Sequence, residues 1–194
     1  MINDILFHQD FPANYQCSPL DELPGNSTEI RYFNPSHRQQ NPHDGLLASI
    51  ETENGISWIG MFEWGDPSFA SGVNGFWSMP NDDCVCAVSR GVAYIVPVTN
   101  VETYDVVQLR PISLVFPVPS FGVLILGDFV RLTAFGKQGK LWTTPRLSWD
   151  GLELSGVKGT HIIGNGWDAP NQKWIRFSVN LETGVHEGGS TPPT

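Results

Sequence analysis

Four residues near the middle of the chain form its most compact group of potential metal ligands: Asp82, Asp83, Cys84 and Cys86. Thiolates and carboxylates both bind zinc. In a strand, Cys84 and Cys86 would lie on one face about 6.6 Å apart, near the upper limit for a disulfide. No CxxC or HxxxH pattern supplies the second ligand pair that a specific zinc motif needs. Because free cysteine is among the most often buried residues, we interpret both as core residues, with a zinc site as the alternative.

Two histidines and a carboxylate offer a second kind of chemistry. His37, His43 and Asp44 lie in a Pro-rich segment, where a histidine beside a carboxylate could act as a general base or bind a metal. The chain has no GxSxG elbow for a nucleophilic serine and no Walker-type glycine loop for a phosphate. We therefore assign no catalytic residue, cofactor or metal ligand. A metal-dependent hydrolase is the third of three functional interpretations, and its candidate metal ligands are Cys84, Cys86, His43 and Asp44. The lack of a catalytic motif favours a protein that is not an enzyme.

Aromatic residues are crowded between residues 56 and 79. Trp58, Phe62 and Trp64 share one parity of an expected strand and form a core wall. Residues 65–83 are rich in Gly, Ser and Asn, and we expect a long loop there. Its aromatic side chains either fold back as a lid over the domain or form a recognition surface with an acidic rim, since loop aromatics anchor partners and stack on sugars. The candidate binding residues are Phe69, Phe76, Trp77, Asp66, Asp82 and Asp83.

The charge balance narrows the class of partner. Eleven Lys and Arg against twenty Asp and Glu give a formal charge of -9, which repels nucleic-acid phosphates and anionic lipids. The leading interpretation is a non-catalytic intracellular interaction protein that engages a macromolecule, such as a basic protein, through an acidic surface and the aromatic loop. Bacterial immunity proteins neutralise toxins in this way. The alternative is a small-molecule or carbohydrate-binding β domain that stacks its ligand on Trp77 and Phe76. The plainest view of the charge is that it keeps the protein soluble.

Location and assembly are expected from simple patterns. The first twenty residues lack a basic start followed by an apolar run, and the three cysteines form no disulfide framework. We therefore expect a cytoplasmic protein with no membrane partner. An exposed strand rich in Val and Ile, such as residues 92–98, would need covering. The chain is thus expected to be a monomer or a homodimer paired through such an edge.

Turn pairs between apolar runs indicate how the chain is folded. Asn54-Gly55, Arg90-Gly91 and Gly127-Asp128 each separate two expected strands, which predicts antiparallel hairpins. No window has the apolar spacing of an amphipathic helix. We expect about twelve strands in an all-β sandwich or partly open barrel with very little helix. The expected organisation is an irregular leader over residues 1–45 packed on the domain, a single β domain over 46–187 and a flexible tail over 188–194.

One local run resembles a known family. The sequence GVLILGDFVRLTAFGKQGKLW, from Gly122 to Trp142, is similar to the repeat of quinoprotein-type β-propellers in the positions of Gly127, Ala134, Gly139 and Lys140. The resemblance implies a blade-like hairpin. It does not imply a propeller, because closure takes at least four four-stranded blades and twelve strands supply only three.

Overall fold

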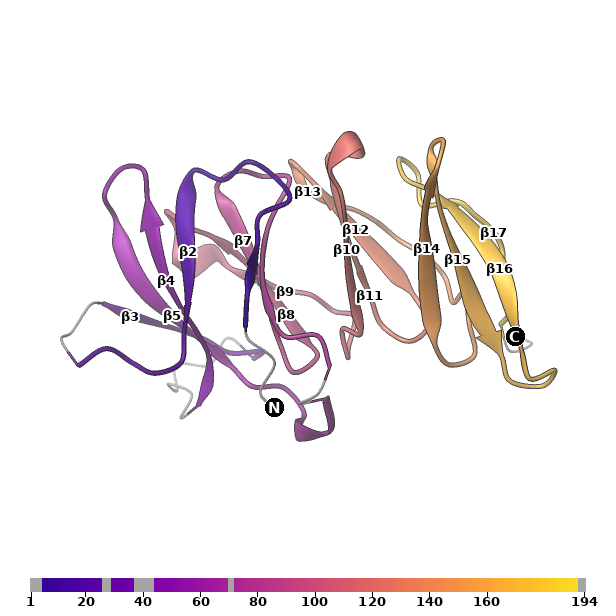
Figure 1. The fold of residues 1–194 in the computed structure, drawn as a ribbon, viewed down its shortest axis with the longest axis horizontal. Coiled ribbons are helices and arrows are strands. Elements are labelled where there is room, and N and C mark those ends of the chain that lie inside the picture. Colours follow the sequence, from indigo (N-terminus) through magenta and orange to yellow (C-terminus); the bar gives the residue numbers. More distant parts are fainter. Residues whose placement is uncertain (1–4, 26–28, 37–43, 70–71, 192–194) are drawn as a thin grey trace. The chain divides into compact units, whose positions relative to one another are not determined.

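The structure, a computed structural model, describes residues 5–25, 29–36, 44–69 and 72–191. The chain divides into two compact units, Met1–Arg110 and Pro111–Thr194. Figure 1 shows the strands of both units in sequence colours. The expected single domain over residues 46–187 spans the boundary between these units, and whether the two unfold as one domain stays a prediction.

The first unit is a sandwich of two sheets. One sheet has the strand order β1-β6-β7-β8-β9 and the other has the order β2-β4-β5-β3. The pairs β1–β6 and β3–β5 are parallel and the other pairs are antiparallel. The strands of the first sheet are β1 (Phe7–His8), β6 (Gly75–Ser78), β7 (Cys84–Ser89), β8 (Val92–Pro97) and β9 (Asp105–Val106). Those of the second are β2 (Tyr15–Leu20), β4 (Gly45–Thr52), β5 (Ser57–Glu63) and β3 (Ile30–Phe33).

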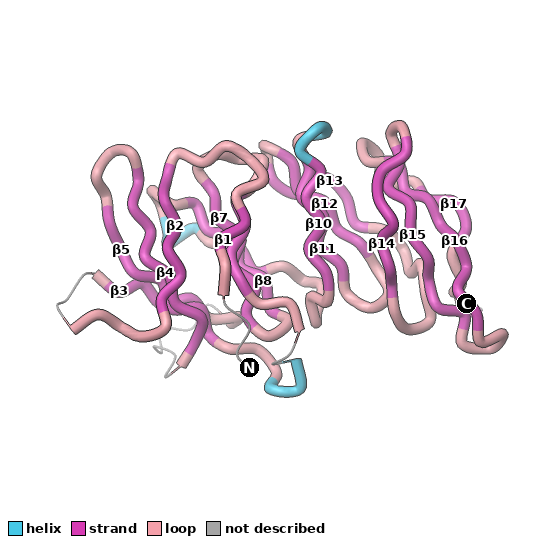
Figure 2. The backbone as a smooth tube through the Cα atoms, in the orientation of Figure 1, coloured by secondary structure: helices cyan, strands magenta, loops and turns pink. Residues whose placement is uncertain are grey.

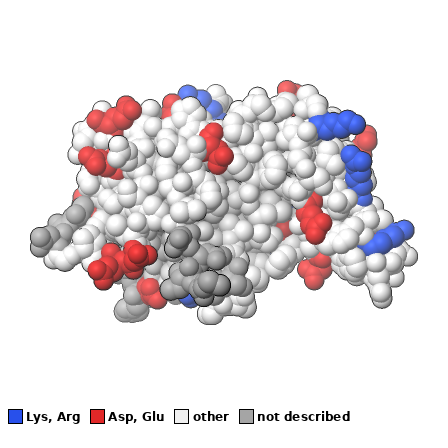
Figure 3. Space-filling view, viewed as in Figure 1, with Lys and Arg blue, Asp and Glu red and all other residues white. Residues whose placement is uncertain are grey.

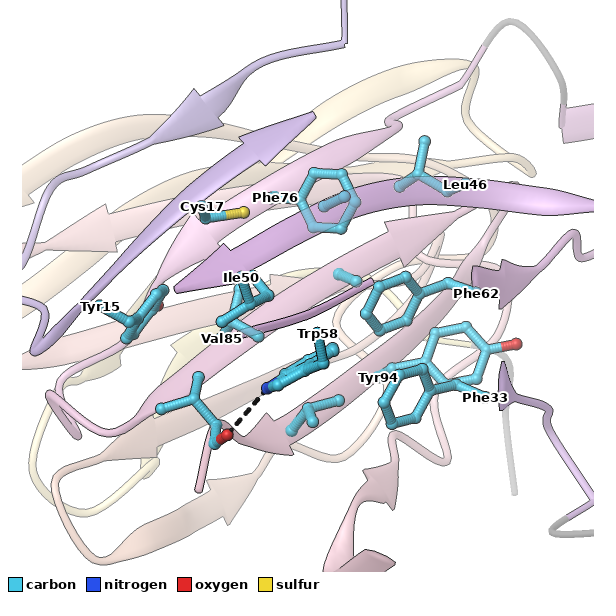
Figure 4. Close-up of a cluster of buried hydrophobic side chains, with 14 of the residues drawn as sticks. Tyr15, Cys17, Phe33, Leu46, Ile50, Trp58, Phe62, Phe76, Val85 and Tyr94 are labelled. Carbon is cyan, nitrogen blue, oxygen red and sulfur yellow. Dashed lines mark hydrogen bonds between the residues drawn. The ribbon is translucent and has the colours of Figure 1, made fainter. Parts of the chain in front are cut away.

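The core of this sandwich is strongly aromatic (Figure 4). Phe33 stacks on Phe62 with ring centroids 4.6 Å apart. The indole nitrogen of Trp58 donates a hydrogen bond to the carbonyl of Val98 at 3.0 Å, so this large ring is buried without an unsatisfied polar atom. Trp58 and Phe62 are both core residues and Trp64 packs against them, which confirms the core wall expected from their shared parity.

The second unit also consists of two sheets. Each is a four-stranded antiparallel meander, with the orders β10-β11-β12-β13 and β14-β15-β16-β17. Its core includes Ile125, Leu132, Trp142 and Phe177. The indole of Trp142 donates to the carbonyl of Leu181 at 2.8 Å. The strands are β10 (Leu114–Val118), β11 (Val123–Gly127), β12 (Leu132–Gly136), β13 (Gly139–Thr143), β14 (Leu152–Lys158), β15 (His161–Asp168), β16 (Lys173–Asn180) and β17 (His186–Gly188).

The expected fold class is confirmed. The structure is 52% strand and 5% helical, and none of its four sheets closes into a barrel. Its helical elements are the short 3-10 turns η1 (Pro67–Phe69), η2 (Val101–Thr103) and η3 (Pro119–Phe121). Across the described ranges, the search for a helix long and apolar enough to span a membrane finds none.

Two of the three turn pairs are where they were expected, while Gly127 of the third is the last residue of β11 and residues 128–131 connect it to β12. At the β4–β5 hairpin Gly55 has a φ of 78°, and at the β7–β8 hairpin Arg90 and Gly91 have φ values of 45° and 81°. Two successive positive φ values are those of a type I′ turn, whose twist matches that of the flanking strands. Arg90 adopts this unusual conformation with its guanidinium 4.3 Å from the centre of the Trp64 ring.

The structure corrects the prediction that residues 1–45 form an irregular leader. Residues 1–45 include β1, β2 and β3, and Tyr15 and Cys17 of β2 are part of the core. These strands lie at the ends of the two sheets, where only one side needs a partner and a residue such as Pro19 is tolerated. Short terminal strands also explain why about twelve strands were expected while the described residues form seventeen.

The strand expected to form a dimer edge is also corrected. β8 lies between β7 and β9 and is therefore not an edge. In the second unit, the run from Gly122 to Trp142 forms the strands β11, β12 and β13. Its relation to propeller repeats stays a prediction.

Candidate functional site

The predicted aromatic loop is largely a strand. Phe76 and Trp77 belong to β6, where Phe76 is fully buried and packs edge-on against Phe62, with centroids 5.5 Å apart. Trp77 is 7% exposed and stacks on His8, with centroids 5.0 Å apart and planes 11° from parallel. Neither ring is available as a stacking platform, so this part of the predicted site is wrong. Successive strand residues point to opposite faces, and both faces of β6 are covered, so two adjacent aromatic residues are both buried. In the sequence alone, such an adjacent pair resembles the anchor of a binding loop.

The acidic residues of the predicted rim lie at opposite ends of one strand. Gly65, next to Asp66, donates its amide to the carbonyl of Ser89 at the end of β7, whereas Asp83 immediately precedes the first residue of β7. Six strand residues span about 17 Å. The structure therefore brings Asp82 and Asp83 together but separates them from Asp66.

Asp66 has a local structural role. Its carboxylate accepts hydrogen bonds from the hydroxyl and amide of Ser68, at 2.7 and 2.9 Å, and these bonds lower the pKa of the carboxyl. The bonds hold the start of η1, where Phe69 is half-buried.

The cysteines are core residues, as favoured from the sequence. Cys84 and Cys86 are buried and free, on the face of β7 opposite to Val85 and Ala87. Burial raises the pKa of Cys84 to about 11 and that of Cys86 to about 12, so both are thiols rather than thiolates at neutral pH.

The remaining metal nominees do not assemble a site in the part of the chain that is described. No group of three potential metal ligands occurs among those residues. Asp44 accepts a hydrogen bond from the amide of Gly45 at 2.9 Å. His37 and His43 lie outside the described residues.

A groove runs along β2 at one side of the sandwich. It has a volume of about 700 Å³ and lies where β1 and β2 end their respective sheets. Figure 2 shows these two strands side by side. Phe7, Ala13, Tyr15 and Cys17 supply apolar atoms to the groove, and Gly55 of the β4–β5 turn lies at one end. The polar lining residues are Gln9, Gln16, Ser18, Glu51, Thr52 and Glu53.

Beside the groove, hydrogen bonds of Tyr15 in β2 and of Asn14, the residue before β2, join the two sheets of the first unit. The Tyr15 hydroxyl donates to the carbonyl of Cys84 at 2.8 Å. The Asn14 side chain donates to the carboxylate of Asp83 at 3.0 Å, and the Asn14 amide donates to the carbonyl of Asp82 at 2.9 Å. Asp82 and Asp83 therefore lie beside the groove, while Asp66 does not.

The groove is acidic, and the described residues that line it include no basic side chain. Glu51 and Glu53 line it, are exposed and have no ion-pair partner within the described ranges. The charge of the whole chain is concentrated in the same unit. The first unit has four basic residues (Lys and Arg) and fourteen acidic residues (Asp and Glu), which give a net charge of -10. The second unit has seven basic and six acidic residues, which give +1, so the whole chain has a net charge of -9. In Figure 3 most of the visible Lys and Arg atoms lie over the second unit.

Sequence reasoning missed this groove because it assigned β2 to an irregular leader. A signal was present: Tyr15 and Cys17 alternate with Gln16 and Ser18, which is the period of a half-buried strand. Only three-dimensional pairing shows that this strand ends its sheet next to Glu51 and Glu53.

No protein-family model matches the chain, and no curated protein matches it.

Proposed function

We propose that the chain is a non-catalytic interaction protein whose first unit binds a basic segment of a macromolecular partner in the groove beside β2. The observation that carries this proposal is an open groove with a mostly polar lining, in which Glu51 and Glu53 have no ion-pair partner among the described residues. Phe7, which is half-buried, offers a small apolar area for a partner to cover, and Glu51 and Glu53 favour a cation beside it.

The distribution of charge supports the same class of partner. A unit with a net charge of -10 attracts basic surfaces from a distance and repels nucleic acid. Three free, buried cysteines support a reducing compartment such as the cytoplasm as the place of this function.

The test uses a fluorescein-labelled peptide with lysine and threonine in alternation, as long as β2, and a matched peptide with glutamate in place of lysine. Fluorescence anisotropy should show saturable binding of the lysine peptide and none of the glutamate peptide. Replacing both groove carboxylates, Glu51→Lys with Glu53→Lys, should weaken binding by about tenfold or more.

The matched control is Glu182→Lys with Glu187→Lys. It makes the same change of charge at two exposed residues of the second unit. Its affinity for the lysine peptide should stay near that of the unmodified chain. Equal losses in the two double variants, or no binding of the lysine peptide at all, would reject the proposal.

A second candidate function rests on an exposed aromatic pair in the second unit. Trp174 is 44% exposed and lies edge-on to Trp167, with centroids 5.4 Å apart. Trp167 pairs with Trp174, and Asn165 with Arg176, across β15 and β16, so the four side chains share one face. An exposed indole flanked by amide and guanidinium groups suits stacking on a sugar. Quenching of tryptophan fluorescence by a sugar panel, lost in Trp174→Ala, would support it, and an unresponsive spectrum would exclude the sugars tested.

A further inference from the structure

We infer that the basic segment binds as an added strand, extending the sheet β2-β4-β5-β3 along the edge of β2 that pairs with no other described strand. This inference rests on the proposed function and specifies how the partner is held. Edge strands carry a row of backbone donors and acceptors that another chain can pair with.

The backbone hydrogen bond of Asn14, the residue before β2, shows which backbone groups of β2 face away from β4. The amide of Glu53 donates to the carbonyl of Asn14 at 3.0 Å. In an antiparallel pair, residues that bond to the partner strand alternate with residues that do not. Gln16 and Ser18 therefore direct their backbone towards β4, as Asn14 does with its carbonyl, and Tyr15, Cys17 and Pro19 direct theirs towards the groove.

This alternation places Pro19 where its missing amide hydrogen does no harm, as expected of an edge strand. The outward backbone groups are then the amides of Tyr15 and Cys17 and the carbonyls of Tyr15, Cys17 and Pro19. An incoming strand can pair with all of these groups without displacing any bond of the sheet.

The side chains around this edge specify the incoming sequence. Tyr15 and Cys17 point into the sandwich, so added residues on the same face meet the part of the groove that Phe7, Tyr15 and Cys17 line. Gln16 and Ser18 lie on the outer face, where Glu51 is paired with Gln16. Added residues on the outer face therefore lie two strands, about 9.6 Å, from Glu51, a distance that a Lys or Arg side chain can reach across Gln16. The preferred segment is extended, with Lys or Arg at alternate positions and small apolar or hydroxyl residues between them.

A second copy of the chain fits this edge poorly. Pairing β2 with β2 would bring two first units, each with a net charge of -10, edge to edge, and their like charges repel each other. The other long edge, β14, has a register shift between Leu154 and Gly156, and such bulges protect edges from pairing.

The experiment separates strand addition from simple attraction of charge. Three versions of the lysine-threonine peptide are compared: unmodified, N-methylated at every threonine and N-methylated at every lysine. In an antiparallel pair the threonines face the groove and their amides bond to β2, so threonine methylation should weaken binding at least tenfold while lysine methylation has little effect. If the peptide pairs parallel to β2, the lysine amides bond to β2 instead, and lysine methylation should then be the change that weakens binding. Either contrast supports strand addition.

A difference smaller than threefold between the two methylated peptides, with the unmodified peptide bound, would overturn strand addition and leave the proposed function standing. Failure of the unmodified peptide to bind would remove both. Amide hydrogen exchange provides a second readout on the unaltered chain: the Tyr15 and Cys17 amides should slow by at least tenfold on adding the unmodified peptide. Unchanged exchange of these two amides would also overturn the inference. So would a dimer, detected by sedimentation, in which the two amides are already protected from exchange before the peptide is added.

Discussion

The Tyr15 hydroxyl donates a hydrogen bond of 2.8 Å to the carbonyl of Cys84, and this bond joins the second sheet of the first unit to the first sheet beside the groove. The phenol is buried, and burial raises the pKa of Tyr15 well above its usual value, so the hydroxyl remains a donor at physiological pH. The groove is thus lined by a residue that also holds the two sheets together.

Removing this hydroxyl should weaken the first unit. Tyr15→Phe keeps the ring and deletes one buried hydrogen bond, so we expect a loss of about 1 kcal/mol in the free energy of unfolding. Urea denaturation followed by circular dichroism measures the loss. Tyr32→Phe, at a half-buried position of β3, serves as the control and should change the free energy much less. Equal losses in the two variants would contradict a specific role for the Tyr15 bond.

The buried indole nitrogens of Trp58 and Trp142 predict a matched effect in the two units. Trp58→Phe and Trp142→Phe each remove one buried hydrogen bond, to Val98 and to Leu181, together with part of a packed ring. Each change should lower the free energy of unfolding by about 2–3 kcal/mol. Trp174→Phe, at an exposed position, should stay within about 0.5 kcal/mol. Hydrogen exchange then shows whether each loss is confined to the unit that carries the change.

The buried thiols predict that stability falls at alkaline pH. The folded pKa of Cys86 is about 12 and that of Cys17 is also about 12, both above the ordinary value of 9.0. Below about pH 9 both states are protonated and the stabilisation is complete. Above that pH the unfolded chain loses the proton while the folded chain keeps it, so stability falls by up to about 1.4 kcal/mol per pH unit for each thiol.

The thiol prediction is checked by the slope rather than by the absolute stability. Between about pH 9 and pH 11, Cys86→Ala should have a shallower decline in unfolding free energy than the unmodified chain, by up to the contribution of one proton. A disulfide-exchange reagent at neutral pH should react slowly with the native chain and rapidly with all three cysteines in urea. An unaltered slope in Cys86→Ala would contradict the raised pKa.

A close approach at Gly60 predicts coupling with Phe62. A Cβ atom at Gly60 would lie 2.6 Å from the ring of Phe62, so Gly60→Ala should lower the free energy of unfolding by about 1–3 kcal/mol. Phe62→Leu should relieve part of this overlap, and a double-mutant cycle should give a coupling of at least about 0.5 kcal/mol. Gly55→Ala provides a contrast, because its loss comes from a φ of 78° with open space around the Cβ, and it should show no coupling with Phe62.

The hairpins of this fold were predictable because their signals are local. An Asn-Gly pair tolerates positive φ whatever surrounds it, and β16 alternates Phe177 and Val179 with polar residues along one continuous strand. Two-residue strands such as β1 and β9 have no period to detect, and their formation depends on a neighbouring strand that the local sequence does not specify.

The candidate site was less predictable for a similar reason. A count of charges gives -9 but does not show that Glu51 and Glu53 lie beside an open edge, which requires the pairing of β2 with β4. The aromatic residues misled because Phe76 and Trp77 are neighbours in a Gly-rich sequence, and only the packing of both faces of β6 shows that they are interior.

The uneven division of charge, -10 on the first unit and +1 on the second, has a consequence for the response to ionic strength. Added salt screens repulsion among the carboxylates of the first unit and so stabilises its folded state, while the nearly neutral second unit gains little. The same screening weakens the attraction between the groove and a cationic segment. We therefore expect a rise in ionic strength to make the fold more stable and the complex weaker.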